Sequence, residues 1–247
     1  MCLPMWKFYL PIAYQFAKET KSRLLLPDYR LAPESCFPAA LDDCLDAVRW
    51  VTSQWTQRDE LVVVGDSAGG NLALNMAIDI NSPKGLVLMS PWLDLSHSSK
   101  WWAADSEDDV VFPIPARRAA WLYVRGDDDW DFGNFDPEAV NKFETAVKNP
   151  RVSPLFGDLT FASASSVLIQ ASRSERLLGD SCMLWEKLSG LPPNINVPSG
   201  SEKITTNHNT HQLSIWDNTP HVWQITRPWS AAGVHAVSDI VQFVNSL

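Results

Sequence analysis

Residues 61–77, LVVVGDSAGGNLALNMA, decide how the rest of the sequence is interpreted. An apolar run leads directly into a Gly-x-Ser-x-Gly pentapeptide at residues 65–69, and apolar residues at helical spacing follow at once. A strand, this pentapeptide and a helix in that order are typical of a nucleophile elbow, a strained turn that projects a serine side chain. Such a turn requires very small residues two positions before and after the serine, and Gly65 and Gly69 meet that requirement. A plain strand-to-helix turn with a capping serine is the alternative interpretation.

Predicted strands and helices alternate on both sides of this segment. Short apolar runs predict strands at residues 23–29, 60–66, 84–92, 166–172 and 211–217. Helical patterns are predicted at residues 6–20, 34–55, 70–80, 177–188 and 231–246. Strands that are apolar on both faces and alternate with helices indicate an α/β fold, with a mainly parallel sheet covered by helices on both faces.

Two longer segments interrupt this alternation. Residues 96–158 are rich in tryptophan and acidic residues, and we expect them to form a cap or lid over the carboxyl ends of the strands. Four tryptophans in or near this insertion could line an acyl pocket or form the core of the cap itself: Trp101, Trp102, Trp121 and Trp130. Residues 191–210 are predicted to be a polar surface loop, so residues 1–247 are expected to form a single domain.

A serine nucleophile needs a general base, and the base needs a carboxylate that orients it. In this architecture the chain order is serine, then aspartate or glutamate, then histidine. Glu175 lies just past the predicted strand at 166–172, with Asp180 five residues further on. Of the five histidines, only His221 is both late in the chain and on a loop that follows a predicted strand. The backbone N–H of Ala68, the residue after the serine, is expected to face the oxyanion.

Several motifs together resemble the hormone-sensitive-lipase-like branch of the α/β-hydrolase fold. They are DYRLAPE at 28–34, GDSAGGNLA around the serine, SPWLDLS and SPL on either side of the insertion, SERLLGDS, and PHVWQ. These motifs are spread over most of the chain, and their combination is highly specific. The resemblance implies an α/β-hydrolase fold and a carboxylesterase that cleaves small or medium acyl esters through an acyl-enzyme. It implies no metal and no organic cofactor.

The resemblance also assigns roles to individual residues. It implies that Ser67 is the nucleophile and that His221 is the general base and later the general acid. Glu175 occupies the position of the triad acid, where many members of the family have aspartate, and Asp180 is the alternative. Asp66 and Gly69 belong to the elbow motif and are predicted binding residues.

The sequence departs from the family in one respect. The oxyanion loop His-Gly-Gly-Gly occurs nowhere in the sequence, and the first three strands of the family have no counterpart, so the chain resembles the family without its N-terminal part. Ala68 would then be the remaining oxyanion donor. The strands at 23–29 and 60–66 would either pair directly or leave a gap with unpaired apolar edges. The alternative function is therefore a truncated or non-catalytic, ligand-binding member of the same fold.

Composition and charge exclude some classes of partner. The net charge of −9 argues against a nucleic-acid partner, because phosphate binding requires a basic face. The four cysteines show no C-x-x-C spacing and favour reduced thiols in a cytoplasmic protein. The N-terminal apolar run lacks the features of a signal peptide and is too short to span a bilayer. A small-molecule ester is the expected partner.

Two further patterns could suggest metal ions. Positions 1, 3, 5 and 12 of a calcium loop would be occupied by Asp127, Asp129, Asp131 and Glu138, but Phe132 stands where the turn needs glycine. His208 and His211 lack a third ligand. We therefore predict a solvated acidic loop and no metal site.

Overall fold

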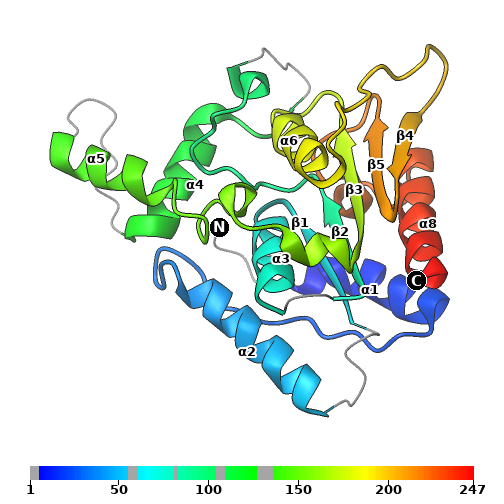
Figure 1. Ribbon diagram of the computed structural model, residues 1–247, viewed down its shortest axis with the longest axis horizontal. Helices are drawn as coiled ribbons and strands as arrows, with labels where there is room; N and C mark the ends of the chain where they lie inside the picture. Colours follow the sequence, from blue (N-terminus) through cyan, green and yellow to red (C-terminus); the bar gives the residue numbers. More distant parts are fainter. Residues whose placement is uncertain (1–5, 55–60, 81–82, 104–108, 127–135) are drawn as a thin grey trace.

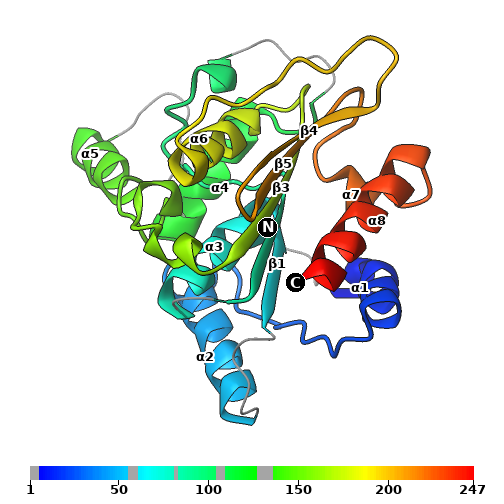
Figure 2. The same ribbon diagram turned by 45° about the vertical axis from the view of Figure 1, so that its right-hand side comes forward.

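The computed structural model describes residues 6–54, 61–80, 83–103, 109–126 and 136–247. They form a central sheet with helices on both faces (Figures 1 and 2). The strand order is β1-β2-β3-β5-β4. These strands are β1 (Val62–Asp66), β2 (Gly85–Met89), β3 (Ser166–Ser172), β4 (Lys203–His208) and β5 (His211–Trp216). Four of them are parallel, and β4 is antiparallel to β5, so the prediction of a mainly parallel sheet is confirmed.

The two faces of the sheet carry different helices. One face packs against α3 (Ser67–Ile80) and α6 (Leu178–Ser189), and the other packs against α1 (Trp6–Thr20) and α8 (Ala231–Ser246). Figure 2 shows the sheet nearly edge-on between these two pairs. Neighbouring residues of β2 separate accordingly, because Leu86 and Leu88 face α3 and α6 whereas Val87 and Met89 face α1 and α8. Each side chain of a central strand is therefore buried, which explains the continuous apolar runs in the sequence.

Two sequence predictions about these elements were wrong, and the start of one predicted helix differs. Residues 23–29 form no strand, and Leu24, Leu25 and Leu26 are 44%, 48% and 44% exposed. The predicted polar loop at 191–210 contains β4, which is stabilised by its pairing with β5. Helix α3 begins at Ser67 and not at Gly70.

The sheet ends at β1. On its outer side β1 pairs with no strand among the described residues, and Val64 in its middle is 38% exposed. Of the two arrangements considered for the strands at 23–29 and 60–66, direct pairing is therefore wrong. The edge of β1 is unpaired, as in the second arrangement, and the apolar residues 24–26 are exposed.

The insertion between β2 and β3 has a small core of its own. It carries the 3-10 turn η2 (Lys100–Ala103), α4 (Pro113–Arg125) and α5 (Pro137–Ala146), and α5 projects away from the sheet in Figure 1. Trp121 is buried against Phe143, with 5.2 Å between the ring centroids, so this tryptophan belongs to the core of the insertion. Trp130 lies outside the described residues.

The remaining elements are short or peripheral. Helix α2 (Ala39–Gln54) packs on α3, and α7 (Trp223–Thr226) packs beside α8. Two 3-10 turns, η3 (Pro154–Phe156) and η4 (Thr160–Ser163), precede β3. Within the described part of the chain, no helix has the length and apolarity required to cross a bilayer.

Candidate active site

The predicted elbow is present between β1 and α3. Ser67 has a φ of 50°, a strained left-handed conformation that turns the chain sharply from strand to helix. The turn is tight at Gly65, where an added Cβ would lie 2.3 Å from the Gly69 carbonyl oxygen and 2.7 Å from the Ala73 Cβ. At Gly69 the nearest atom to an added Cβ is 3.8 Å away, which is ordinary contact. The expectation that both glycines are required for space is therefore correct for Gly65 and wrong for Gly69.

The backbone around the serine is held in place. The Trp92 N–H donates to the Ser67 carbonyl oxygen at 3.0 Å, which ties the elbow to the segment after β2. Ala68 lies in the first turn of α3, where backbone N–H groups have no acceptor within the helix. The positive end of the α3 dipole lies at the same place. Both features suit a developing negative charge beside Ser67.

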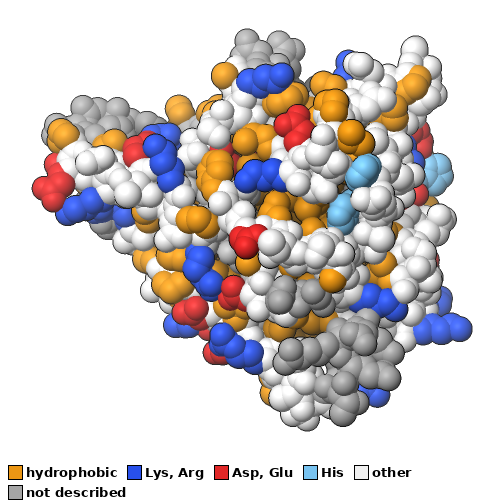
Figure 3. Space-filling view, in the orientation of Figure 1, with side chains coloured by type: hydrophobic (Ala, Val, Ile, Leu, Met, Phe, Trp, Pro, Cys, Tyr) orange, Lys and Arg blue, Asp and Glu red, His pale blue; other side chains and the backbone are white. Residues whose placement is uncertain are grey.

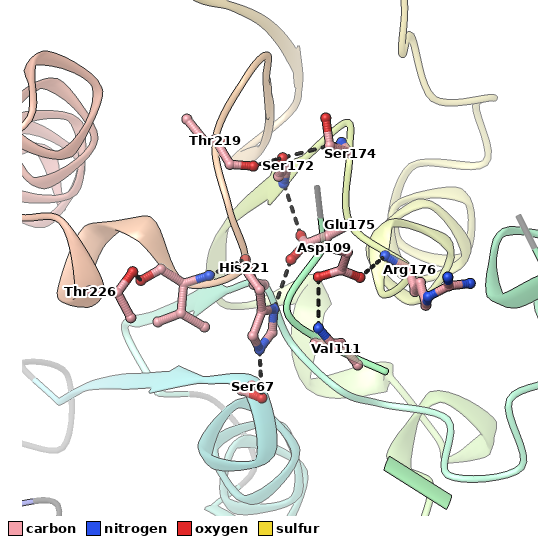
Figure 4. A network of polar contacts seen from close by, with 12 residues as sticks. Ser67, Asp109, Val111, Ser172, Ser174, Glu175, Arg176, Thr219, His221 and Thr226 are labelled. Atoms are coloured by element: carbon pink, nitrogen blue, oxygen red, sulfur yellow. Dashed lines mark hydrogen bonds and ion pairs between the residues drawn. The ribbon is translucent and has the colours of Figure 1, made fainter. Parts of the chain in front are cut away.

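Three side chains from distant parts of the chain form a continuous hydrogen-bonded series (Figure 4). His221 Nε2 lies 2.9 Å from Ser67 Oγ, and His221 Nδ1 lies 2.8 Å from Glu175 Oε2. A carboxylate can only accept, so Nδ1 carries the proton and the free Nε2 accepts the serine hydroxyl. The structure thus brings together Ser67, Glu175 and His221, the three residues that the sequence analysis selected.

Main-chain contacts fix the acid and the base. The Ser172 N–H, at the end of β3, donates to Glu175 Oε1 at 2.9 Å, and the Ser172 hydroxyl donates to the Thr219 carbonyl at 2.6 Å. The loop that carries His221 is therefore tied to the end of β3. Val222 has a φ of 52°, and its N–H donates to Ser90 Oγ at 3.3 Å. These supporting roles leave no signal in the sequence, because each depends on loops that meet only in the folded chain.

The electrostatic surroundings raise the pKa of His221. Burial is the largest single influence and lowers it, but the hydrogen bond and the charge of Glu175 raise it, and the charges of Asp109 and Asp66 add to that effect. The net direction is upward, so these carboxylates stabilise the imidazolium form. A histidine in this setting can accept a proton and hold it beside the serine.

Asp66, the residue before the serine, is engaged by the N-terminal helix. The hydroxyl of Tyr9 in α1 donates to Asp66 Oδ2 at 2.9 Å. Desolvation raises the pKa of Asp66, while the Tyr9 hydrogen bond and the charge of His221 act in the opposite direction. The predicted binding roles of Asp66 and Gly69 stay predictions.

Asp180, the alternative triad acid, has a different task. Its Oδ2 accepts the backbone N–H groups of Leu93 and Asp94 at 2.7 and 2.9 Å. Burial raises the pKa of Asp180 to about 8. Its carboxyl group thus fixes the chain after β2, and it is Glu175 that contacts His221.

Other histidines lie outside this series. His97 is stacked between Trp92 and Trp102, with centroid distances of 5.5 and 3.7 Å, and burial lowers its pKa to about 4. His208 and His211 are paired at the end of the β4–β5 hairpin, and His235 is exposed beside Glu202.

The structure describes only part of the two sequence patterns that could suggest metal ions. Among the described residues, no three or more His, Cys, Asp or Glu side chains are grouped so that they could hold a metal ion. Asp127, Asp129, Asp131 and Phe132 of the calcium pattern lie outside those residues. Glu138 is described, and it forms an ion pair with Lys142 at 2.7 Å.

The fold of the chain matches that of known proteins. Residues 6–192 match the family model described as alpha/beta hydrolase fold. The chain belongs to the alpha/beta hydrolase family. A solved esterase from the bacterial hormone-sensitive lipase family superposes with a TM-score of 0.74 at 26% identity, covering 96% of this chain and 70% of that one. A hormone-sensitive lipase from a metagenome library gives a TM-score of 0.75 at 29% identity, covering 96% and 72%. The resemblance to the hormone-sensitive-lipase-like branch of the family is thereby confirmed.

Two relatives with established names are similar to most of this chain. An esterase of Acinetobacter venetianus is 29% identical over 236 residues, covering 94% of this chain and 67% of its own length. The carboxylesterase/phospholipase LipF of Mycobacterium tuberculosis is 28% identical over 228 residues, covering 91% of this chain and 53% of its own length. The chain therefore spans roughly half to two thirds of the length of these hydrolases.

Proposed function

We propose that the chain is a serine carboxylesterase that hydrolyses small or medium acyl esters through an acyl-enzyme. The observation that carries the proposal is the pair of hydrogen bonds joining Ser67 Oγ to His221 and His221 to Glu175, at 2.9 and 2.8 Å. Acyl transfer by a serine requires a nucleophile, a base and an orienting acid that are joined by hydrogen bonds in this way. The names of the relatives, esterase and carboxylesterase, support the same reaction class.

The proposed reaction has two halves that use the same groups. Ser67 Oγ attacks the ester carbonyl carbon, and its proton passes to His221 Nε2. The imidazolium is stabilised through Nδ1–H by Glu175, and it then gives its proton to the leaving alcohol as the carbon–oxygen bond breaks. In the second half a water molecule loses a proton to His221 and attacks the acyl-enzyme, and the carboxylic acid leaves as Ser67 recovers its proton.

The proposed reaction requires hydrogen-bond donors that stabilise the oxyanion. The Ala68 N–H and the N-terminus of α3 supply one donor and a favourable field. The His-Gly-Gly-Gly segment that supplies further donors in the resembling family is absent from the sequence. Removal of one oxyanion donor typically costs about 10² to 10³ in kcat, so the Ala68 N–H is an important part of the proposed site.

The test is hydrolysis of p-nitrophenyl acetate, butyrate and octanoate, with Ser67→Ala as the control. A rate that vanishes in Ser67→Ala, and that falls from butyrate to octanoate, is the expected result. Reaction with phenylmethylsulfonyl fluoride, followed by intact mass, reports separately on an activated serine. Wild type that neither hydrolyses these esters above the Ser67→Ala background nor forms the adduct would refute the proposal and favour the non-catalytic alternative.

Surface charge bears on the expected partner, and the thiols bear on the proposed location of the protein. A small-molecule ester is the proposed substrate, and on the face shown in Figure 3 the described Lys and Arg side chains are interspersed with acidic ones and form no continuous basic patch for nucleic acid. Among the described residues Cys36, Cys44 and Cys182 are free thiols, which supports the proposed cytoplasmic location.

A further inference from the structure

Asp109 joins two segments of the chain (Figure 4). One is residues 109–111 of the proposed cap insertion, called the cap entrance below. The other is the turn at residues 173–177 that carries Glu175, called the acid turn. Its side chain is buried, and its Oδ2 accepts the backbone N–H of Arg176, the residue after Glu175, at 2.7 Å. Its Oδ1 accepts the N–H of Val111 at 3.0 Å. One carboxylate therefore binds both the cap backbone and the backbone of the acid turn.

Arg176 adds a second connection between the same two segments. Its guanidinium Nη1 donates to the Trp102 carbonyl at 3.0 Å, in the 3-10 turn η2. Trp102 stacks in turn on His97, which lies between Trp102 and Trp92. The cap is thus attached to the acid turn at two places, around residue 102 and around residue 109, and both attachments use Arg176.

The charge of Asp109 also acts on the proposed general base. Three carboxylates influence His221: Glu175 from the acid turn, Asp66 from the end of β1, and Asp109 from the cap entrance. Asp66 accepts a hydrogen bond from Tyr9, and Glu175 contacts the imidazole directly. Asp109 is only 5% exposed, so water screens its charge weakly.

We propose that Asp109 is a positioning residue of the esterase site, which holds the cap entrance against the acid turn and supplies His221 with a stabilising negative charge in addition to that of Glu175. This inference rests on the proposed function of the site. It means that the seating of the cap and the basicity of the catalytic histidine depend on one side chain. A cap that moved away from the acid turn would weaken the base at the same time.

The test compares Asp109→Asn with the matched control Asp158→Asn. Asp158 is exposed and accepts the N–H of Thr160 at 2.9 Å, two residues on, just as Asp109 accepts the N–H of Val111. The pKa of His221 is read by NMR titration of the imidazole in both variants and in wild type, with the resonance assigned through His221→Gln. Amide hydrogen exchange at Val111 and Arg176 reports on the attachment.

Removal of a negative charge lowers the pKa of His221, so we expect a fall of about half a unit to one unit in Asp109→Asn and no change in Asp158→Asn. The acid limb of kcat/KM should move to lower pH by the same amount. Asp109→Glu keeps the charge while displacing the oxygens, so it should restore the pKa of His221 but leave faster exchange at Val111 and Arg176.

Two results would overturn the proposal. An unchanged pKa of His221 in Asp109→Asn removes the charge role, and unchanged amide exchange in both Asp109 variants removes the positioning role. If Asp109→Asn does not fold, exchange in Asp109→Glu still decides the second role, and an unaltered rate there counts against it. Because NMR titration needs no turnover, an inactive wild type would refute the esterase while leaving this measurement interpretable.

Discussion

Gly65→Ala is the substitution that tests the elbow most directly. The added Cβ would lie 2.3 Å from the Gly69 carbonyl oxygen and 2.7 Å from the Ala73 Cβ. Both neighbours belong to the first two turns of α3, which carries Ser67 at its start. The clash can be relieved only if the end of β1 and the start of α3 move apart.

The size of that movement sets the expected effect. Ordinary contact begins near 3.4 Å, so the backbone must shift by about 1 Å. A displacement of about 1 Å at a catalytic group can cost roughly 10²-fold in rate, because the reacting atoms lose their alignment. Overpacking of a well-filled site typically costs about 1–3 kcal/mol of stability. For a chain of this size that is roughly 2–4 °C in Tm for each kcal/mol.

Gly69→Ala is the matched control for stability. Gly69 lies in the same pentapeptide, but its added Cβ would meet nothing closer than Asp66 Oδ1 at 3.8 Å. Alanine is favoured over glycine in a helix by up to about 1 kcal/mol, so this variant should keep or raise the Tm. The assay is thermal unfolding of both variants, together with hydrolysis of p-nitrophenyl butyrate by Gly65→Ala.

One pair of results would refute the reasoning. If Gly65→Ala kept the Tm and the rate of wild type, the close approach of β1 and α3 would not control the serine. If Gly69→Ala lowered the Tm as much as Gly65→Ala, the difference in space between the two glycines would have no energetic meaning.

Three other predictions each concern one side chain. Glu175→Gln should lower kcat by about 10²–10⁴ and move the acid limb of the pH profile to lower pH, because the negative charge of Glu175 raises the pKa of His221. Asp180→Asn is its control in the same ester assay: since burial raises the pKa of Asp180 to about 8, a neutral amide should be tolerated, and a loss as large as that of Glu175→Gln would restore Asp180 as the acid. His97 is neutral in the folded chain, with a pKa lowered to about 4, so His97 alone should contribute a loss of about 2 kcal/mol in unfolding free energy between pH 7.5 and pH 5 as the unfolded state binds protons. Urea denaturation of His97→Phe at both pH values should lack that contribution. An equal change in unfolding free energy with pH in wild type and His97→Phe would contradict the prediction. Leu25 is 48% exposed beside Leu24 and Leu26, so this apolar surface should promote self-association of the chain. Leu25→Glu should weaken the self-association roughly tenfold in sedimentation experiments. Equal association of wild type and Leu25→Glu would show that this surface is not involved.

Elements with strong local patterns were predicted well from the sequence. The bounds of α1, α8 and β3 in the structure, Trp6–Thr20, Ala231–Ser246 and Ser166–Ser172, are those that the sequence pattern predicted. Their signal is local, because helical periodicity and a continuous apolar run each show which faces of the element are buried. The elbow was recognisable for the same reason, since its residues are adjacent in the chain.

The triad was predictable because the fold constrains chain order. Side chains that follow parallel strands gather at the same edge of the sheet, so Glu175 after β3 and His221 after β5 had to approach Ser67. The choice between Glu175 and Asp180 was not local. It depended on which carboxylate reached the imidazole and which reached the backbone after β2, and only the packed turn decides that.

The sequence by itself determined the α/β alternation, the nucleophile elbow, and the serine and histidine of the candidate site, because each of these follows from local pattern or chain order. Tertiary structure decided whether an apolar or polar run became a strand. Residues 23–29 remained unpaired because a strand needs a partner for its hydrogen bonds, whereas the polar β4 found one in β5. It also decided that Asp109 would contact the turn that carries Glu175. That contact joins Asp109 to Arg176, which are 67 positions apart in the chain. Contacts of this kind depend on how loops from different strands come together, and no pattern along the chain encodes that.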